Sequence, residues 1–182
     1  MAETPSKMIA LGTQIPPFSL PTCTGKLWSR NKNQRGILVI FMCNHCPFVV
    51  HIAEILPTIH KYCQNAGIEF IGINSNDVEN YPDDHPEKMV DIAKFYGWTF
   101  PYLYDEDQSV AKAFNAACTP DIFLYSDTGH LFYRGQLDDS RPNSSISATG
   151  KDLLNAIDLL NSGASPPAQQ LPSIGCNIKW KS

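Results

Sequence analysis

Two cysteines stand two residues apart in the segment Cys43-Asn44-His45-Cys46, and this pair is where the sequence most clearly predicts chemistry. The segment follows an unbroken apolar run, 37–42, and helical spacing begins directly after it. Cysteines at this spacing form a reversible dithiol and disulfide, in which a thiolate is the nucleophile. The same spacing also suits a metal ion. The elements that surround the pair must therefore decide between the two hypotheses.

The position of each cysteine predicts its role in exchange. We expect Cys43 to lie in the first turn of a helix, where unpaired N–H groups and the helix dipole favour a thiolate. Cys43 is then an accessible nucleophile, and Cys46, one turn deeper, resolves the mixed disulfide. A charged His45 would further stabilise the thiolate. The alternative is a binding module with an idle dithiol, which a buried and inert Cys43 would indicate.

Composition and charge narrow the class of protein. The chain has 182 residues, of which 43% are hydrophobic and 18% charged, with a net charge of −4. This is a globular composition without the basic runs of nucleic-acid binding, and no apolar run approaches the ~20 residues of a membrane span. The first residues lack the features of a secretory signal. We therefore expect a cytoplasmic protein that binds neither nucleic acid nor membrane and needs no bound cofactor.

Apolar patterning predicts alternating strands and helices in one domain, 1–182, with an N-terminal extension (1–35) and a C-terminal tail (163–182). A strand-helix-strand unit implies a parallel pair, and a later hairpin adds antiparallel strands. Pro57 is expected to kink the first helix. The predicted strands cover 18–20, 26–28, 37–42, 68–73, 122–125 and 130–134, and the predicted helices cover 47–66, 86–96, 109–115 and a segment from 150.

This order of elements resembles the thioredoxin superfamily, and within it the alkyl hydroperoxide reductase and redoxin-like branch. The motifs that carry the resemblance are Cys43-Asn44-His45-Cys46-Pro47, Asn74-Ser75-Asn76-Asp77, Phe100-Pro101-Tyr102-Leu103-Tyr104-Asp105, Cys118-Thr119-Pro120-Asp121, the segment 134–142 and the segment 172–180. The resemblance implies an α/β thioredoxin-like fold, with a central mixed sheet flanked by helices, an N-terminal β-hairpin and a C-terminal tail. It also implies a cis Pro120 opposite the dithiol, with Thr119 pairing its backbone with a substrate chain.

The resemblance further implies thiol–disulfide exchange between the Cys43–Cys46 pair and protein or small-molecule thiols and disulfides. The His before the second cysteine resembles the disulfide isomerases, which implies a more oxidising couple than thioredoxin. Two departures from thioredoxin stand out: Met42 replaces a tryptophan, and Ile40 replaces a buried acid. A thiol-dependent peroxidase that reduces hydroperoxides at Cys43 is the alternative, but Gly36 and Ile40 replace the Pro and Thr of the peroxiredoxin signature.

Several other residues offer chemistry that the motif alone does not settle. Cys118 and Cys176 are additional redox candidates, against the simpler expectations of a buried thiol and a packed tail. Arg134 and Arg141 are candidates for the activating arginine of a peroxidase. A copper or zinc site is a further alternative, although a second Cys-x-x-Cys is absent and no metal is expected. Its conceivable ligands are Cys43, Cys46, His45, His51 and the remote His130.

Overall fold

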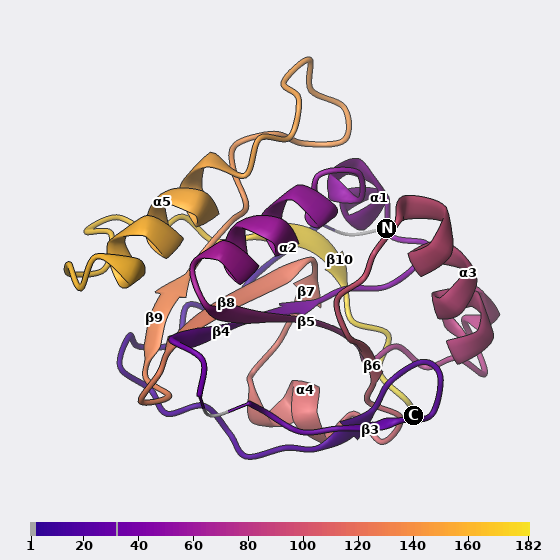
Figure 1. The fold of residues 1–182 in the computed structure, drawn as a ribbon. Helices are drawn as coiled ribbons and strands as arrows, with labels where there is room; N and C mark the ends of the chain where they lie inside the picture. Colours follow the sequence, from indigo (N-terminus) through magenta and orange to yellow (C-terminus); the bar gives the residue numbers. More distant parts are fainter. Residues whose placement is uncertain (1–2, 32) are drawn as a thin grey trace.

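The computed structural model describes residues 3–31 and 33–182. Its main sheet has the strand order β6-β5-β4-β8-β9 (Figure 1). β4 pairs parallel with β5 and antiparallel with β8, so the sheet is mixed, as predicted. The strands are β4 (Gly36–Phe41), β5 (Ile68–Asn74), β6 (Tyr102–Tyr104), β8 (Asp121–Ser126) and β9 (Leu131–Arg134).

β4 is buried along its whole length because helices cover both faces of the sheet. Leu38 and Ile40 pack with side chains of α1, α2, α3 and α5, whereas Ile37 and Val39 pack with side chains of α4. An uninterrupted apolar run is what such a doubly covered strand requires. The helices are α1 (Pro47–Ile52), α2 (Leu56–Asn65), the 3₁₀ turn η1 (Pro82–Asp84), α3 (Pro86–Tyr96), α4 (Ser109–Ala113) and α5 (Lys151–Asn161).

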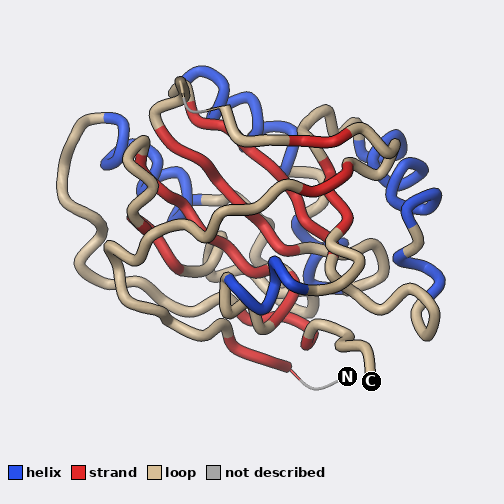
Figure 2. The backbone as a smooth tube through the Cα atoms, turned by 90° about the horizontal axis from the view of Figure 1, so that it is seen from below, coloured by secondary structure: helices blue, strands red, loops and turns tan. Residues whose placement is uncertain are grey.

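The two faces of the sheet are covered differently. α1, α2 and α5 lie above the strands in Figure 1, and α4 lies below them. Figure 2, which looks from below, shows α4 and the long loops in front of the central strands. The N-terminal extension contributes the predicted short hairpin, which consists of β2 (Leu20–Pro21) and β3 (Leu27–Trp28).

The predicted helix over 47–66 is two helices, α1 and α2, separated at 53–55. Pro57 explains the break, because it has no N–H to bond residue 53 and its ring clashes with the carbonyl of that residue. The interruption is therefore stronger than the predicted kink. It confines the first helical segment after the dithiol to six residues.

A second, smaller sheet was missed by the sequence patterns. It has the antiparallel order β1-β10-β7, formed by β1 (Glu3–Pro5), β10 (Ile174–Asn177) and β7 (Cys118–Thr119). Cys176 pairs with Thr119 on one side and with Glu3 on the other. The C-terminal tail is thus a central strand beside the Cys-x-x-Cys segment.

Candidate functional site

The Cys-x-x-Cys segment leaves the carboxyl end of β4 and enters α1. Cys46 is the N-cap residue of α1 and Pro47 follows it, so Cys43 lies before the helix. The prediction that Cys43 occupies the first helical turn was therefore wrong. Proline at the first helical position explains this boundary, because it needs no hydrogen-bond acceptor there. The helix terminus consequently faces Cys46 more directly than Cys43.

Both sulfurs are covered by protein. The exposed fraction is 1% for Cys43 and 0% for Cys46, and no disulfide joins any of the six cysteines. The prediction of an accessible Cys43 was wrong, because β10 and the polar segment after β5 lie over the pair. Burial is the feature expected of an idle dithiol, so any exchange at Cys43 must proceed through a change in this cover or through another group.

The Thr119–Pro120 segment lies beside both sulfurs, as the resemblance implied. The Thr119–Pro120 peptide bond is cis, which confirms that prediction. The Thr119 hydroxyl lies 3.4 Å from Cys43 Sγ, and the Cys46 thiol donates to the Thr119 carbonyl at 3.1 Å. One residue therefore contacts both members of the pair.

The ionisation of the pair differs from the prediction. Hydrogen bonds from the Cys43 thiol above all, and then from Cys176, Thr119 and the Val49 N–H, lower the pKa of Cys46 to about 5, although its burial opposes this. The contact with the Thr119 carbonyl also favours the protonated thiol, but the donors outweigh it. Donation to Cys46, burial and the nearby Asp84 carboxylate raise the pKa of Cys43 well above its ordinary value. The favoured thiolate is thus Cys46.

Asp84, at the end of η1, is a buried acid that the sequence reasoning missed. Its carboxylate is fully buried, accepts hydrogen bonds from the Asn44 N–H and the Asn76 amide, each at 2.8 Å, and lies 2.8 Å from His45 Nδ1. This contact raises the pKa of His45, although partial burial opposes the shift. When protonated, His45 forms an ion pair with the buried Asp84 carboxylate beside Cys43.

The sequence does contain a signal that places Asp84 near the Cys-x-x-Cys segment. β4 and β5 are parallel neighbours, so the segments at their carboxyl ends meet at the same edge of the sheet. The polar segment after β5 includes Asn76 and Asp84, and Asn44 follows β4. A buried acid thus lies beside Cys43, although it comes from another segment than the strand position that Ile40 occupies. Tyr102 completes this group by donating to the Asn44 side-chain oxygen at 3.0 Å.

The two additional cysteine candidates occupy different positions. The Cys118 thiol is buried and donates to the Pro120 carbonyl, which agrees with a packed thiol. Cys176 is hydrogen-bonded to Cys46, and burial raises its pKa to about 12. The structure therefore brings Cys43, Cys46 and Cys176 together.

The histidines and arginines proposed from sequence are mostly engaged elsewhere. His51 contacts Ser140, and His130 contacts Gln14, so neither joins the dithiol. Arg134 forms a fully buried ion pair with Asp121. A peroxidase arginine is therefore not supplied by Arg134.

One group of potential metal ligands does lie at the site. Donor atoms of Cys43, His45 and Asp84 all fall within 4.8 Å of one another. However, the Asp84 carboxylate already contacts the Asn44 N–H, the Asn76 amide and His45. These contacts account for the polar atoms without a metal ion. In the part of the chain that the structure describes, no helix is long and apolar enough to cross a bilayer.

The fold and the Cys-x-x-Cys site beside a cis proline define a thioredoxin-like protein. Its fold is shared with a putative protein disulfide isomerase from Bacteroides thetaiotaomicron, at a TM-score of 0.66 and 17% identity over 87% of this chain and 94% of that one. A secreted Mycobacterium tuberculosis disulfide oxidoreductase gives a TM-score of 0.58 and 18% identity over 78% of this chain and 94% of that one.

The chain belongs to the AhpC/TSA family, whose model matches residues 11–134. It is also similar over nearly its whole length to two structures of uncharacterised proteins. A hypothetical protein from Sinorhizobium meliloti is 44% identical, with a TM-score of 0.96 over 98% of this chain and 99% of that one. An uncharacterised conserved protein from Geobacillus kaustophilus is 46% identical, with a TM-score of 0.94 over 100% of this chain and 97% of that one. No curated protein matches the chain.

Proposed function

We propose that the protein is a thiol–disulfide oxidoreductase that uses Cys43 and Cys46 as its redox-active pair. The observation that carries the proposal is that Thr119, beside cis Pro120, contacts both sulfurs of the Cys-x-x-Cys pair. The favoured Cys46 thiolate supplies a nucleophile at neutral pH. Its partners are thiols and disulfides, and the cytoplasm is the predicted location.

The proposed reaction transfers two electrons without a bound cofactor. In the oxidising direction, a thiolate of the protein attacks a partner disulfide and releases one partner thiol. The second protein thiol then attacks the mixed disulfide, which forms the Cys43–Cys46 bond and releases the other partner thiol. Thr119 positions both sulfurs, and the His45–Asp84 pair sets the charge beside Cys43.

Disulfide mapping by mass spectrometry tests this function. The protein is reduced, treated with oxidised glutathione and digested after its free thiols are blocked. We expect a Cys43–Cys46 disulfide that forms reversibly, with loss of the disulfide in Cys43→Ser. Cys63→Ala is a matched control, because Cys63 is a buried thiol in α2. A reduced pair that survives oxidation unchanged in folded protein would refute the proposal.

A further inference from the structure

β10 holds a third thiol against the dithiol. Cys176 pairs in register with Thr119, the residue that contacts both sulfurs, and hydrogen-bonds to Cys46. Gly175 makes this approach possible, because a Cβ there would overlap the Thr119 carbonyl. β1 fixes the other edge of β10, where Glu3 pairs with Cys176. Strand pairing on both edges thus holds β10 in position where it covers Cys46.

Cys176, which is 3% exposed, is also the member of this group of three cysteines that lines a cleft. A cleft of about 390 Å³ is lined by Glu3, Pro47, Phe48, Arg141, Pro142, Asn143 and Cys176. Cys43 and Cys46 do not line it; they lie behind Cys176 and are at most 1% exposed. A partner that enters this cleft therefore reaches Cys176 before the dithiol.

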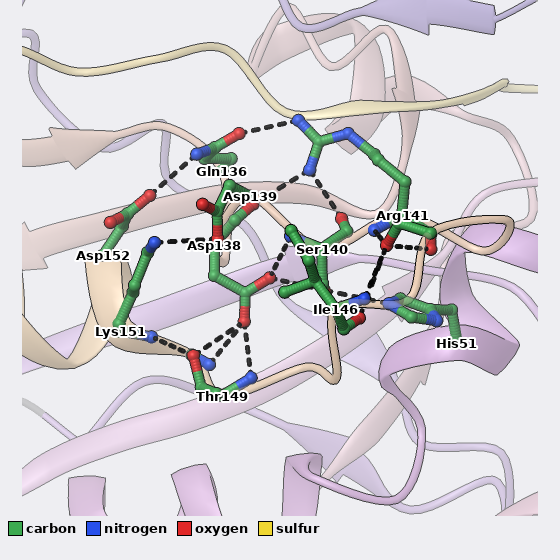
Figure 3. Close-up of polar contacts among 12 residues, drawn as sticks. His51, Gln136, Asp138, Asp139, Ser140, Arg141, Ile146, Thr149, Lys151 and Asp152 are labelled. Carbon is green, nitrogen blue, oxygen red and sulfur yellow. Dashed lines mark hydrogen bonds and ion pairs between the residues drawn. The ribbon is translucent and has the colours of Figure 1, made fainter.

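The loop after β9 contributes Arg141 to the lining of this cleft. The Arg141 guanidinium donates to the carbonyls of Asp138 and Ser140 and to the side-chain oxygen of Gln136 (Figure 3). Among the residues that the structure describes, it contacts no carboxylate. The Asp138 carboxylate stiffens the loop by accepting hydrogen bonds from Ser140, Thr149 and Gly150.

Arg141 and Glu3, two residues of opposite charge, both line this cleft. This combination suits a small disulfide that carries both carboxylate and amino groups. Oxidised glutathione has these groups and is therefore a suitable probe.

We propose that Cys176 is the thiol that meets a small partner disulfide in the cleft and passes the exchange to Cys46 and then to Cys43. This inference rests on the proposed function, because the Cys43–Cys46 disulfide is its end product. Exchange through Cys176 lets a partner disulfide oxidise the buried pair while β10 stays in place.

The steps balance without another reactant. The Cys176 thiol passes its proton to the Cys46 thiolate to which it is hydrogen-bonded and attacks the partner disulfide, which forms a mixed disulfide and releases one partner thiolate. That leaving thiolate takes the proton from Cys46, so Cys46 is again a thiolate. The Cys46 thiolate attacks the Cys176 sulfur, which forms Cys46–Cys176 and releases the second partner thiolate. Cys43 then gives up its proton and attacks the Cys46 sulfur, and Cys176 leaves as the thiolate that takes up a proton. The partner disulfide is reduced to two thiols, and the Cys43–Cys46 pair is oxidised.

Rapid-quench oxidation with oxidised glutathione tests the role of Cys176. Reduced protein is mixed with the probe, quenched with acid, and its adducts and disulfides are located by mass spectrometry. We expect the first glutathione adduct on Cys176. In Cys176→Ser, formation of Cys43–Cys46 should slow by about tenfold or more, because direct attack must reach sulfurs of residues that do not line the cleft. Cys63→Ala should keep the wild-type rate.

The direction of the Cys176→Ser effect separates this role from simple covering. If β10 only covers the dithiol, the variant reacts at the wild-type rate or faster, and the proposal is overturned. Cys43→Ser provides a second test, because it should trap a Cys46–Cys176 disulfide; a glutathione adduct on Cys46 alone would contradict the relay. If wild-type protein forms no Cys43–Cys46 disulfide at all, the proposed function itself fails.

Discussion

The pKa of Cys46 leads to a testable prediction, because the hydrogen bonds to its sulfur determine how much of the residue is thiolate at pH 7. The pKa of Cys46 is lowered to about 5, chiefly by the hydrogen bond from Cys43. At pH 7 a thiol with that pKa is about 99% thiolate, whereas one near an ordinary pKa of about 8.5 is about 3% thiolate. Cys43→Ala removes the main donor, so the pKa of Cys46 should rise and the thiolate fraction at pH 7 should fall.

The assay is the ultraviolet absorbance of thiolate in reduced protein, titrated against pH, with Cys46→Ala subtracted. We expect a step centred near pH 5 in the wild type and a step at higher pH in Cys43→Ala. Cys63→Ala should leave the step unmoved. A wild-type curve that rises only near pH 9, or a step that Cys43→Ala does not shift, would refute the assignment of the thiolate.

The same shift predicts a pH-dependent stability. The folded pKa of Cys46 lies below the unfolded value of about 8.5. The contribution of this thiolate to the free energy of unfolding is therefore full above about pH 8.5 and is lost as the pH falls through about 5. Between these limits the unfolded state binds more protons at this residue. The difference in free energy of unfolding between wild type and Cys46→Ala should therefore grow with pH, by at most about 1.4 kcal/mol per pH unit.

Two further substitutions test the buried charges. Asp84→Asn should lower the pKa of His45, measured by NMR titration of the imidazole, while exposed Asp83→Asn should not; an unchanged His45 titration would contradict the ion pair. Arg134→Met should cost about 3–5 kcal/mol in denaturant unfolding, because it leaves the Asp121 charge buried without its partner. Adding Asp121→Asn to Arg134→Met should recover part of that loss. A cost below about 1 kcal/mol for Arg134→Met alone would show that the ion pair contributes little to the stability of the fold.

The main sheet could be predicted because local patterns determine it. The apolar run of β4 and the spacing in α3 and α5 report burial directly, so these elements lie where expected. β10 could not be found in this way, since its four residues become a strand only through pairing with segments distant in sequence. Contacts of that kind leave no local period in the sequence.

At the site, too, the local features could be predicted and the tertiary ones could not. The Cys-x-x-Cys motif and Thr119–Pro120 were found because residue type and spacing are local properties, and the structure brings them together. The predicted exposure and ionisation of Cys43 were wrong because they depend on Asp84 and Cys176, which come from other segments. A motif thus predicts which atoms can react, while the cover and the charge around them are tertiary properties.

The small sheet has a consequence for how the chain is made. β10 is the last strand of the chain, whereas the Cys-x-x-Cys segment precedes it by most of the sequence. During synthesis the earlier segments emerge and begin to fold first, so the dithiol can form before its cover is translated. Until Ile174–Asn177 docks between β1 and β7, the pair lacks the part of its cover that β10 provides, and oxidants reach Cys46 more easily. The nascent protein should therefore be more sensitive to oxidation than the finished one.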